Sequence, residues 1–313
     1  MPEPSDSGAE RPLPAEQRCG FIAVVGAPNA GKSTLVNALV GTKVTIVSRK
    51  AQTTRVPIRG IAMAGASQLI FIDTPGIFAP RRRLDRAMVE AAWTRAAEAD
   101  VIALVVDAAK GAGSEDTERI LDRLAEMRTQ LLLVLNKVDR VKKETLLGLA
   151  QSLNARIPFQ RTFMISALGG SGVEDLKRAL AELVPPGPWH YPEDDVSDVP
   201  MRLLAAEVTR EKIYERLHEE LPYAITVETT SWKELRDGTV RVEQTIFVER
   251  ESQRGIVLGE GGRTVKQISM EARKELGQML DKAVHLFLHV KVREGWQDDP
   301  ERYREMGLDF PKD

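Results

Sequence analysis

The sequence predicts a doubly wound α/β domain with a mainly parallel sheet, followed by a smaller α+β domain. From residue 21 to about residue 184, short apolar runs alternate with helical patterns. Such runs are typical of strands that are buried on both faces of a parallel sheet. A proline-rich and acidic stretch at 184–200 interrupts this pattern, and strands of alternating polarity follow it. The length of 313 residues suits two domains.

The domain boundaries follow from these changes of pattern. We expect a disordered extension at 1–18, an α/β domain at 19–184, a linker at 185–200 and a second domain with its C-terminal tail at 201–313. The extension is rich in Pro, Glu, Ser and Ala, and it lacks the basic-then-apolar layout of a signal peptide. No apolar run approaches the length that spans a membrane.

Composition narrows the classes of function. The single cysteine, Cys19, excludes a disulfide framework and a cysteine-based metal site, and it suits a reducing cytoplasm. The net charge of −2 gives no whole-surface attraction for nucleic acid, so any such contact must be local. We therefore expect a cytoplasmic globular protein.

The first domain should place its motifs at one edge of its sheet. Strands are expected at residues 21–25, 69–72, 101–106, 131–135 and 162–165, and helices at 34–40, 84–99 and 114–127. Gly41 follows the first helix as its cap. Ligands of doubly wound sheets bind beyond the carboxyl ends of the strands, and the motifs below lie there.

A glycine-rich turn lies between the first strand and the first helix and fits G-x-x-x-x-G-K-[ST]. In this motif, backbone N–H groups and the helix N-terminus surround phosphate oxygens. Lys32 is expected to reach the β- and γ-phosphates, and the Ser33 hydroxyl to bind Mg²⁺. The phosphate-binding residues are expected to be Gly26, Ala27, Pro28, Asn29, Ala30, Gly31, Lys32, Ser33 and Thr34.

A second phosphate-side motif follows the strand at 69–72 and fits D-x-x-G. Its residues are Asp73, Thr74, Pro75 and Gly76. Asp73 is expected to hold Mg²⁺ through water, and the Gly76 N–H to meet the γ-phosphate.

The basic segment 48–55 has the position and composition of switch I in nucleotide-dependent switches, and we choose Thr54 over Thr53 to complete the Mg²⁺ shell. The alternative for residues of this segment is a solvated basic loop.

The strand at 131–135 is followed by the guanine-reading pattern N-K-x-D, formed by Asn136, Lys137, Val138 and Asp139. The Asp139 carboxylate can accept hydrogen bonds from N1–H and the exocyclic amine of guanine. Adenine would leave this carboxylate badly paired, which is costly, so the pattern opposes an ATPase. Asn136 is expected to brace the loop and the Lys137 stem to cover the base. A weaker motif for the base edge is formed by Ser166 and Ala167.

Hydrolysis should be slow without help. Ile77 follows the D-x-x-G motif, where Ras-like GTPases place the glutamine that orients the attacking water. An isoleucine side chain cannot do this, although Ile77 is still expected to contact the nucleotide. The candidate catalytic residues are Lys32, Asn29, Thr54 and Gly76.

The second domain reads as helix, strand, strand, helix, G-x-x-G loop, helix and strand. The elements are expected at 201–221, 223–230, 240–248, 253–258, 263–280 and 283–292, with the loop at 259–262. Such a loop lets two helix ends approach a single-stranded nucleic-acid backbone. The RNA-binding residues are expected to be Ile256, Gly259, Glu260, Gly261, Gly262, Arg263 and Lys266, with the Glu260 side chain pointing away from phosphate. Residues 201–313 hold 19 Lys and Arg against 22 Asp and Glu, which argues against a purely electrostatic binder.

Together these motifs resemble the Era family of bacterial GTPases. The sequence reads K-A-Q-T-T-R at 50–55, D-T-P-G-I at 73–77 and N-K-V-D at 136–139, and the resemblance spans residues 19 to about 307. It implies a P-loop GTPase domain followed by a type II KH domain. It also implies Mg²⁺-dependent GTP hydrolysis, binding of the 3′ end of 16S ribosomal RNA, and a role in maturation of the small (30S) ribosomal subunit. A peripheral association with the inner membrane is implied as well, and we expect a monomer.

Two interpretations of Asn29 stay open. It matches the asparagine that helps to bind a potassium ion in GTPases with a hydrophobic residue at the catalytic position, where K⁺ stabilises charge between the β- and γ-phosphates. The other interpretation is a side chain that braces the loop. The function also has an alternative: a GTP-dependent switch that acts on protein or membrane partners and uses the KH fold as an interaction surface.

Overall fold

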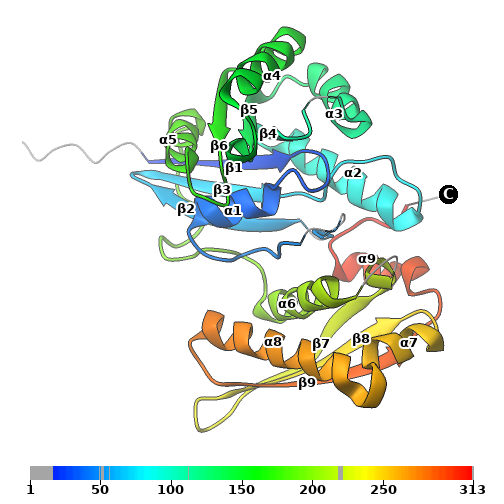
Figure 1. Ribbon diagram of the computed structural model, residues 1–313. Coiled ribbons are helices and arrows are strands. Elements are labelled where there is room, and N and C mark those ends of the chain that lie inside the picture. Colours follow the sequence, from blue (N-terminus) through cyan, green and yellow to red (C-terminus); the bar gives the residue numbers. More distant parts are fainter. Residues whose placement is uncertain are drawn as a thin grey trace, which may run out of the picture.

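Two separate sheets organise the computed structural model, which describes residues 17–48, 50, 53–55, 57–111, 113–217 and 221–311. A six-stranded sheet forms the centre of the first domain, and a three-stranded sheet forms that of the second (Figure 1). The first domain is α/β with a mainly parallel sheet and the second is α+β, as the sequence predicts.

The first sheet has the strand order β2-β3-β1-β4-β5-β6, and only the β2–β3 pair is antiparallel. Its strands are β1 (Arg18–Val25), β2 (Ile58–Ala64), β3 (Ser67–Asp73), β4 (Val101–Asp107), β5 (Gln130–Asn136) and β6 (Arg161–Ile165). The sequence did not predict β2, because small residues and Gly60 weaken its strand signal. A Cβ atom on Gly60 would lie 2.8 Å from Cγ2 of Val40, so glycine lets helix α1 (Lys32–Val40) pack closely on this strand.

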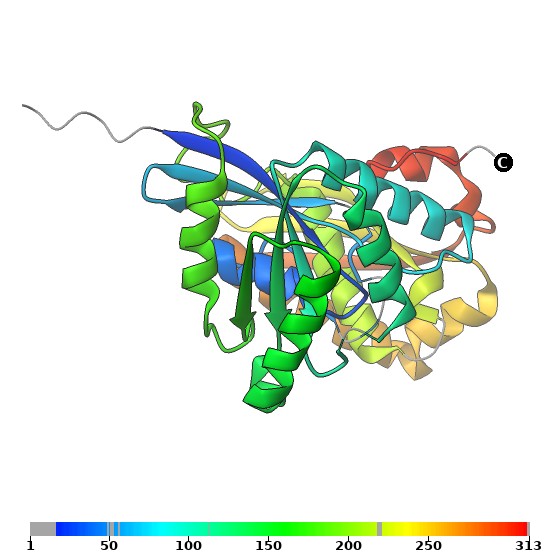
Figure 2. The ribbon, with the colours of Figure 1, turned by 90° about the horizontal axis from the view of Figure 1, so that it is seen from above.

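Helices lie on both faces of this sheet (Figure 2). Core residues of α1 (Lys32–Val40) and α5 (Val173–Leu183) pack on one face. Those of α2 (Arg83–Glu98), α3 (Glu115–Ala125) and α4 (Lys143–Arg156) pack on the other. Gly41 caps α1 in the left-handed conformation with φ of 87°, as expected. Within the described ranges, no helix is long and apolar enough to cross a bilayer.

The second domain packs its helices on one small sheet, in which β7–β8 is antiparallel and β8–β9 parallel. Its elements are α6 (Met201–Arg216), η2 (Leu221–Ala224), β7 (Thr226–Glu234), β8 (Val240–Val248), α7 (Glu251–Leu258), η3 (Glu260–Gly262), α8 (Arg263–Leu280), β9 (Val284–Val292), η4 (Trp296–Asp298) and α9 (Pro300–Glu305). The predicted end of the first helix at 221 is wrong. Leu217 is already extended, and it packs in the core beside Ile225.

The predicted start of the next strand at 223 is also wrong. A short 3-10 turn occupies residues Leu221–Ala224, and β7 begins at Thr226. Pro222 lacks the N–H that a ladder requires, which favours the turn over a strand at this point.

The segment predicted as a linker runs along the edge of the first sheet. The indole Nε1 of Trp189 donates to the Ala66 carbonyl over 3.1 Å. Oε1 of Gln68 accepts the backbone N–H of His190 at 2.9 Å. Farther on, the Ser197 hydroxyl donates to the Arg59 carbonyl over 2.7 Å. The segment is therefore attached to the first domain almost to the start of α6.

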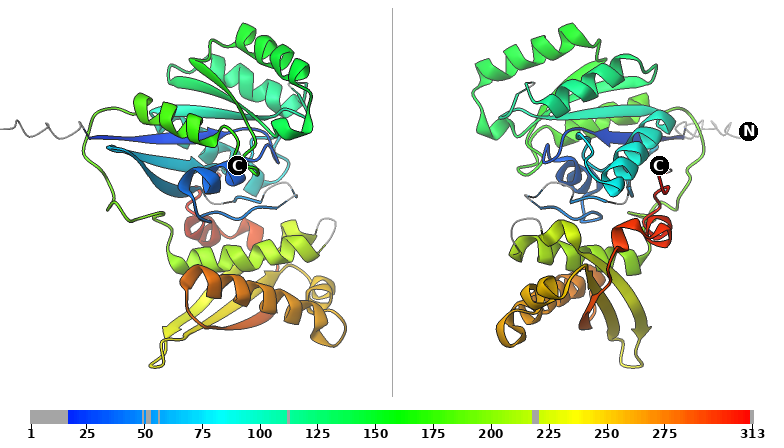
Figure 3. Two further views of the ribbon diagram at one scale, coloured as in Figure 1. Left: turned by 60° about the vertical axis from the view of Figure 1, so that its left-hand side comes forward. Right: turned by 90° about the vertical axis from the view of Figure 1, so that its right-hand side faces the viewer.

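The C-terminal segment makes a second connection between the domains (Figure 3). Its core residues pack on one side of α2 in a single apolar cluster of Leu84, Ala87, Met88, Trp296, Tyr303 and Leu308. Trp296 is 1% exposed, and its Nε1 donates to the Ala224 carbonyl over 3.0 Å. This residue thus stabilises both the second domain and its contact with the first.

We predict that Trp296→Ala lowers the free energy of unfolding by about 3–5 kcal/mol, because a buried aromatic side chain leaves a cavity. Calorimetry should show the loss, with the two domains unfolding in more clearly separated transitions. Trp232→Ala, at a partly buried position on β7 of the same domain, serves as the control. Unfolding of the Trp296 variant at the wild-type midpoint would contradict this role.

Candidate functional site

The turn between β1 and α1 has the backbone geometry of a phosphate loop. Gly31 has φ of 97° and Asn29 has φ of 63°, both in the left-handed region. Lys32 is 6% exposed, and its ammonium donates to the carbonyls of Gly26 (3.1 Å) and Ala27 (3.0 Å). Burial lowers the pKa of Lys32 to about 8, although the nearby Asp73 carboxylate opposes this shift. An anion at this loop would compensate the buried charge.

Four oxygen-bearing side chains meet beside Lys32. Oδ2 of Asp73 accepts hydrogen bonds from Ser33 Oγ (2.7 Å), Thr45 Oγ1 (2.8 Å) and Thr54 Oγ1 (3.2 Å). Oδ1 of Asp73 is buried without a hydrogen-bond partner among the described residues. Burial raises the pKa of Asp73, and the Ser33 hydroxyl is the main group that opposes the shift. Hard oxygen ligands and an unsatisfied carboxylate oxygen fit the Mg²⁺ ion that the sequence predicts here.

The two threonines of the basic segment point differently. Thr54 Oγ1 lies 3.0 Å from Ser33 Oγ, within the oxygen cluster. The Thr53 hydroxyl instead donates to the Lys50 carbonyl over 2.8 Å. Residues 49, 51 and 52 of this segment lie outside the described residues. Thr45, which the sequence did not indicate, joins the cluster from the loop after α1, where no motif marks it.

The D-x-x-G turn approaches the phosphate loop with its backbone. A Cβ atom on Gly76 would lie 2.9 Å from Cα of Pro28, so only glycine fits this contact. The Thr74 hydroxyl donates to the Val24 carbonyl over 2.8 Å. Ile77 is 4% exposed and packs in the core beside Ala92, so its side chain is directed away from the cleft.

The Asn136 carboxamide connects three loops on the base side. Its Nδ2 donates to the Ala30 carbonyl (2.9 Å), and its Oδ1 accepts the N–H groups of Lys137 (2.8 Å) and Ala167 (3.0 Å). A Cβ atom on Gly31 would lie only 2.2 Å from Nδ2, so this arrangement requires glycine there. Asn136 thus braces the phosphate loop as well as its own loop.

The remaining base-side residues lie around this connection. Lys137 Nζ donates to the Asn29 carbonyl and to Asp107 Oδ2, both over 2.6 Å. Asp139 lies at the solvent-facing mouth, and a hydrogen bond from Ser166 is the main cause that lowers its pKa. Val138 and Asp139 belong to the 3-10 turn η1 (Val138–Arg140).

These motifs line one continuous cleft made of two hollows. The phosphate side has a volume of about 550 Å³ and is lined by residues that include Lys32, Ser33, Thr54 and Gly76. The base side has about 660 Å³ and is lined by Asn136, Lys137, Asp139, Ser166 and Ala167. Tyr214 and Glu215 of α6 also line the base side. The sequence did not indicate these two residues, because nothing local in a helix of the second domain marks contact with the first.

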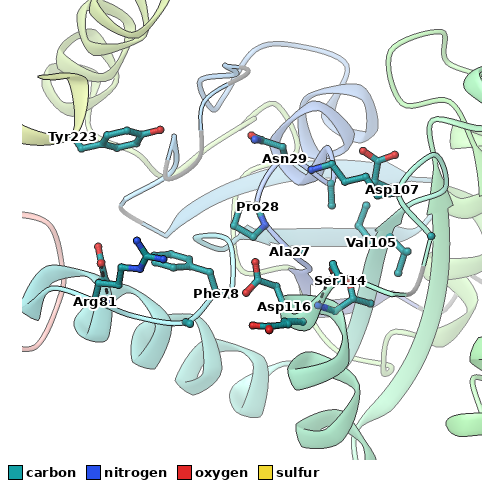
Figure 4. A pocket seen from close by; sticks show the side chains of 18 of the residues that line it. Ala27, Pro28, Asn29, Phe78, Arg81, Val105, Asp107, Ser114, Asp116 and Tyr223 are labelled. Atoms are coloured by element: carbon teal, nitrogen blue, oxygen red, sulfur yellow. Dashed lines mark hydrogen bonds between the residues drawn. The ribbon is translucent and has the colours of Figure 1, made fainter. Parts of the chain in front are cut away.

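Another hollow of about 550 Å³ lies on the far side of Pro28 and Asn29 (Figure 4). Phe78 and Arg81 line it from the loop after the D-x-x-G turn, and Asp116 lines it from α3. Tyr223 of the second domain reaches its rim. The loop after the D-x-x-G turn, α3 and the second domain therefore meet beside the phosphate loop.

The G-x-x-G loop joins α7 to α8. Gly261 and Gly262 have φ of 59° and 76°, and a Cβ atom on either would meet nothing within 4 Å. Glu260 is exposed and forms an ion pair with Arg263, so its carboxylate is paired with one of the cations expected to bind phosphate. Lys266 is exposed on the same helix.

A groove of about 740 Å³ lies next to this loop. Of the predicted RNA-binding residues, Ile256 lines it with a side chain that is 56% exposed. Its other walls include Leu221, Ala224, Arg250, Gln253 and Thr264. The lining combines apolar side chains with arginines, and such a surface can hold bases and neutralise phosphate.

Comparisons with known proteins match both domains. A family described as 50S ribosome-binding GTPase matches residues 21–137, and a KH domain family matches residues 220–297. GTPase Era of Bradyrhizobium sp. (strain BTAi1) is 63% identical over 299 residues, covering 96% of this chain and 97% of that protein. GTPase Era of Brucella suis biovar 1 is 62% identical, covering 95% of each.

Two solved structures are similar over nearly the whole chain. One is Era in complex with MgGDPNP and nucleotides 1506–1542 of 16S ribosomal RNA. The other is a variant of Aquifex aeolicus Era bound to GDP and AlF4⁻. Each has a TM-score of 0.88 and 36% sequence identity, covering 93% of this chain and 99% of the other.

We predict that Asn136→Ala weakens GDP binding by roughly 10- to 100-fold, because buried N–H groups lose their acceptor at about 1–3 kcal/mol each. Fluorescence titration would measure the affinity, and denaturant unfolding the stability. Asn154→Ala is the control, since its carboxamide donates to the Ala150 carbonyl and the Thr162 hydroxyl outside the nucleotide cleft. Equal losses of GDP affinity in both variants would refute the bracing role.

Proposed function

Because this chain belongs to the Era family of GTPases, we propose that it binds the 3′ end of 16S ribosomal RNA through its KH domain and assists maturation of the 30S subunit. The chain is a GTPase, and GTP binding is the switch in this proposal. The observation that carries the proposal is the presence in one chain of a cleft with guanine-nucleotide motifs and of a groove next to a G-x-x-G loop. A relative of the same fold over nearly its full length holds MgGDPNP and this RNA.

The residues of the cleft divide the work of nucleotide binding. The phosphate loop would surround the phosphates with N–H groups, and Lys32 would exchange its two carbonyl partners for phosphate oxygens. Ser33 and Thr54 would hold Mg²⁺ directly and Asp73 through water; the ion would neutralise charge on the β- and γ-phosphates. Asp139 would select guanine by accepting from N1–H and the exocyclic amine.

Hydrolysis needs a group other than residue 77. The Ile77 side chain is packed in the core, so it cannot orient water. We propose that Asn29 helps to hold a potassium ion against the phosphates. The position of Asn29 on the wall of the phosphate hollow, with its carbonyl bound to Lys137, supports this role.

RNA binding would use the groove between α7, α8 and η2. Its apolar wall can hold unstacked bases, and backbone N–H groups of the G-x-x-G loop can meet phosphates. Phosphate would have to displace Glu260 from Arg263, which lowers affinity and favours ligands that also make base contacts. This agrees with the acidic balance of residues 201–313.

The RNA assignment predicts tight binding of a short RNA that copies the 3′ end of small-subunit ribosomal RNA, measured by fluorescence anisotropy with a non-hydrolysable GTP analogue. Gly262→Asp should reduce affinity by about tenfold or more, because a carboxylate at the N-terminus of α8 repels phosphate. A Cβ atom there meets nothing within 4 Å; the left-handed backbone strains any side chain, and aspartate is among the residues that adopt this conformation most readily.

The matched control is Gly238→Asp in the β7–β8 hairpin, which has φ of 81° and equal open space but lies outside the groove. It should bind RNA as the wild type does. Absence of RNA binding by the wild type with either GDP or the analogue would refute the assignment.

The potassium proposal predicts that GTP turnover in KCl exceeds turnover in NaCl of equal ionic strength by about tenfold or more. Asn29→Gly should remove this difference, since glycine keeps the left-handed backbone and loses the side-chain oxygen. Asn29→Asp retains an oxygen and should retain the dependence. Equal rates in both salts for the wild type would contradict the proposal.

A further inference from the structure

Arg55 leaves the first domain and inserts its side chain into the second. It follows Thr54, the residue that joins the oxygen cluster around Asp73. Its side chain is 2% exposed. Arg55 is thus one residue from the predicted Mg²⁺ site and is buried at the interface between the domains.

The guanidinium of Arg55 caps the turn that starts β7. Its Nη1 donates to the Ile225 carbonyl over 2.8 Å, and its Nη2 donates to the Tyr223 carbonyl over 2.9 Å. We call residues 221–225 the capped turn. Carbonyls at the end of a helical turn carry negative partial charge and attract a cation. The guanidinium carbon also lies 5.7 Å from the centroid of the Trp296 ring.

The opposite side of the capped turn forms a wall of the RNA groove. Leu221 and Ala224 line the groove together with Ile256 and Thr264. The same short turn therefore contacts switch I on one side and the groove on the other. This turn by itself connects switch I to the groove.

Other residues of switch I, and Val47 just before it, also contact α6. Glu211 Oε1 accepts the backbone N–H of Val47 over 2.7 Å, and Arg210 donates to the Thr53 carbonyl. Lys50 donates to the carbonyls of Tyr214 and Leu217. These contacts place α6 directly against switch I, as seen in the left view of Figure 3.

The chemistry of the Arg55 contact suits a contact that forms and breaks. Its guanidinium donates to carbonyls and to the Tyr214 hydroxyl, and its Nε is buried without a partner among the described residues. For a permanent interface, apolar residues of equal volume would be as stable or more stable than a buried charge. A guanidinium can return to water when switch I is released.

Resting on the function proposed above, we propose that Arg55 is the positioning residue that couples the nucleotide state to the RNA groove. When GTP and Mg²⁺ are bound and Thr54 holds the ion, Arg55 stays bound to the carbonyls of the capped turn and thereby fixes the wall of the groove. When hydrolysis releases switch I, Arg55 withdraws and the wall loses its support. By linkage, RNA in the groove must favour the GTP form by the same factor.

The first test measures RNA affinity with GDP and with the GTP analogue, using the same 3′-end RNA. Arg55→Ala should reduce the ratio of the two affinities toward one, a fall of at least about fivefold for a coupling of ordinary strength. Arg156→Ala is the control. That arginine pairs with Asp122 over 2.6 Å between α4 and α3, within the first domain and away from the capped turn. A wild-type ratio in Arg55→Ala would overturn the proposal.

A second test does not depend on RNA. Hydrogen exchange at the amides of Leu221, Tyr223, Ala224 and Ile225 should be slower with the GTP analogue than with GDP in the wild type, and alike in Arg55→Ala. Unchanged exchange in β8 would show that the variant is folded. Nucleotide-dependent protection that persists in Arg55→Ala, or that is absent from the wild type, would overturn the coupling. If only RNA binding fails in the wild type, the RNA function is wrong and this exchange result decides the coupling.

Discussion

The Asn136 carboxamide holds together loops that come from three strands, and the nucleotide cleft depends on this connection. The phosphate loop follows β1, the N-K-x-D loop follows β5 and the Ser166–Ala167 loop follows β6. One side chain, 2% exposed, binds all three. Because Gly31 must lack a side chain for this contact, the second glycine of the phosphate motif also serves the base side. Phosphate and base recognition are therefore built on one hydrogen-bond group.

The two contacts between the domains differ in chemistry. Around switch I the contact is polar: Lys43 pairs with Glu211 and Glu275, and Arg55 meets carbonyls. Around α2 it is apolar, with Trp296 and Tyr303 in one cluster. Polar groups can exchange protein partners for water at small net cost, whereas separation of an apolar cluster exposes its whole surface. The switch side is thus the easier one to open.

Sequence reasoning succeeded where the signal is local and failed where it is tertiary. The apolar runs of β4 and β5 and the motifs at strand ends could be read directly, because burial on both faces and phosphate chemistry each leave a pattern. The roles of the individual site residues stay predictions. Strand β2 was missed because Gly60 serves the close packing of α1, and the end of α6 was misplaced because Leu217 turns inward to the core. The contacts of Tyr214, Glu215 and Arg55 across the domain boundary could not be predicted. Each of these residue types is ordinary on a protein surface, so no sequence pattern marks such a contact.

The predicted linker at 185–200, which is hydrogen-bonded to the first domain, limits how the second domain can move. Ser197 is fixed to β2 and Asp198 to Arg59, so only residues 199–200 remain between this attachment and Met201. From residue 198 to residue 201 the chain spans three residue steps, at most about 11 Å, which prevents wide separation of the domains. The Trp296 cluster is a second point of attachment. A rigid body held at two points retains a single degree of freedom, rotation about the line that joins them. While both attachments hold, the second domain can therefore rearrange only by hinge rotation about this axis.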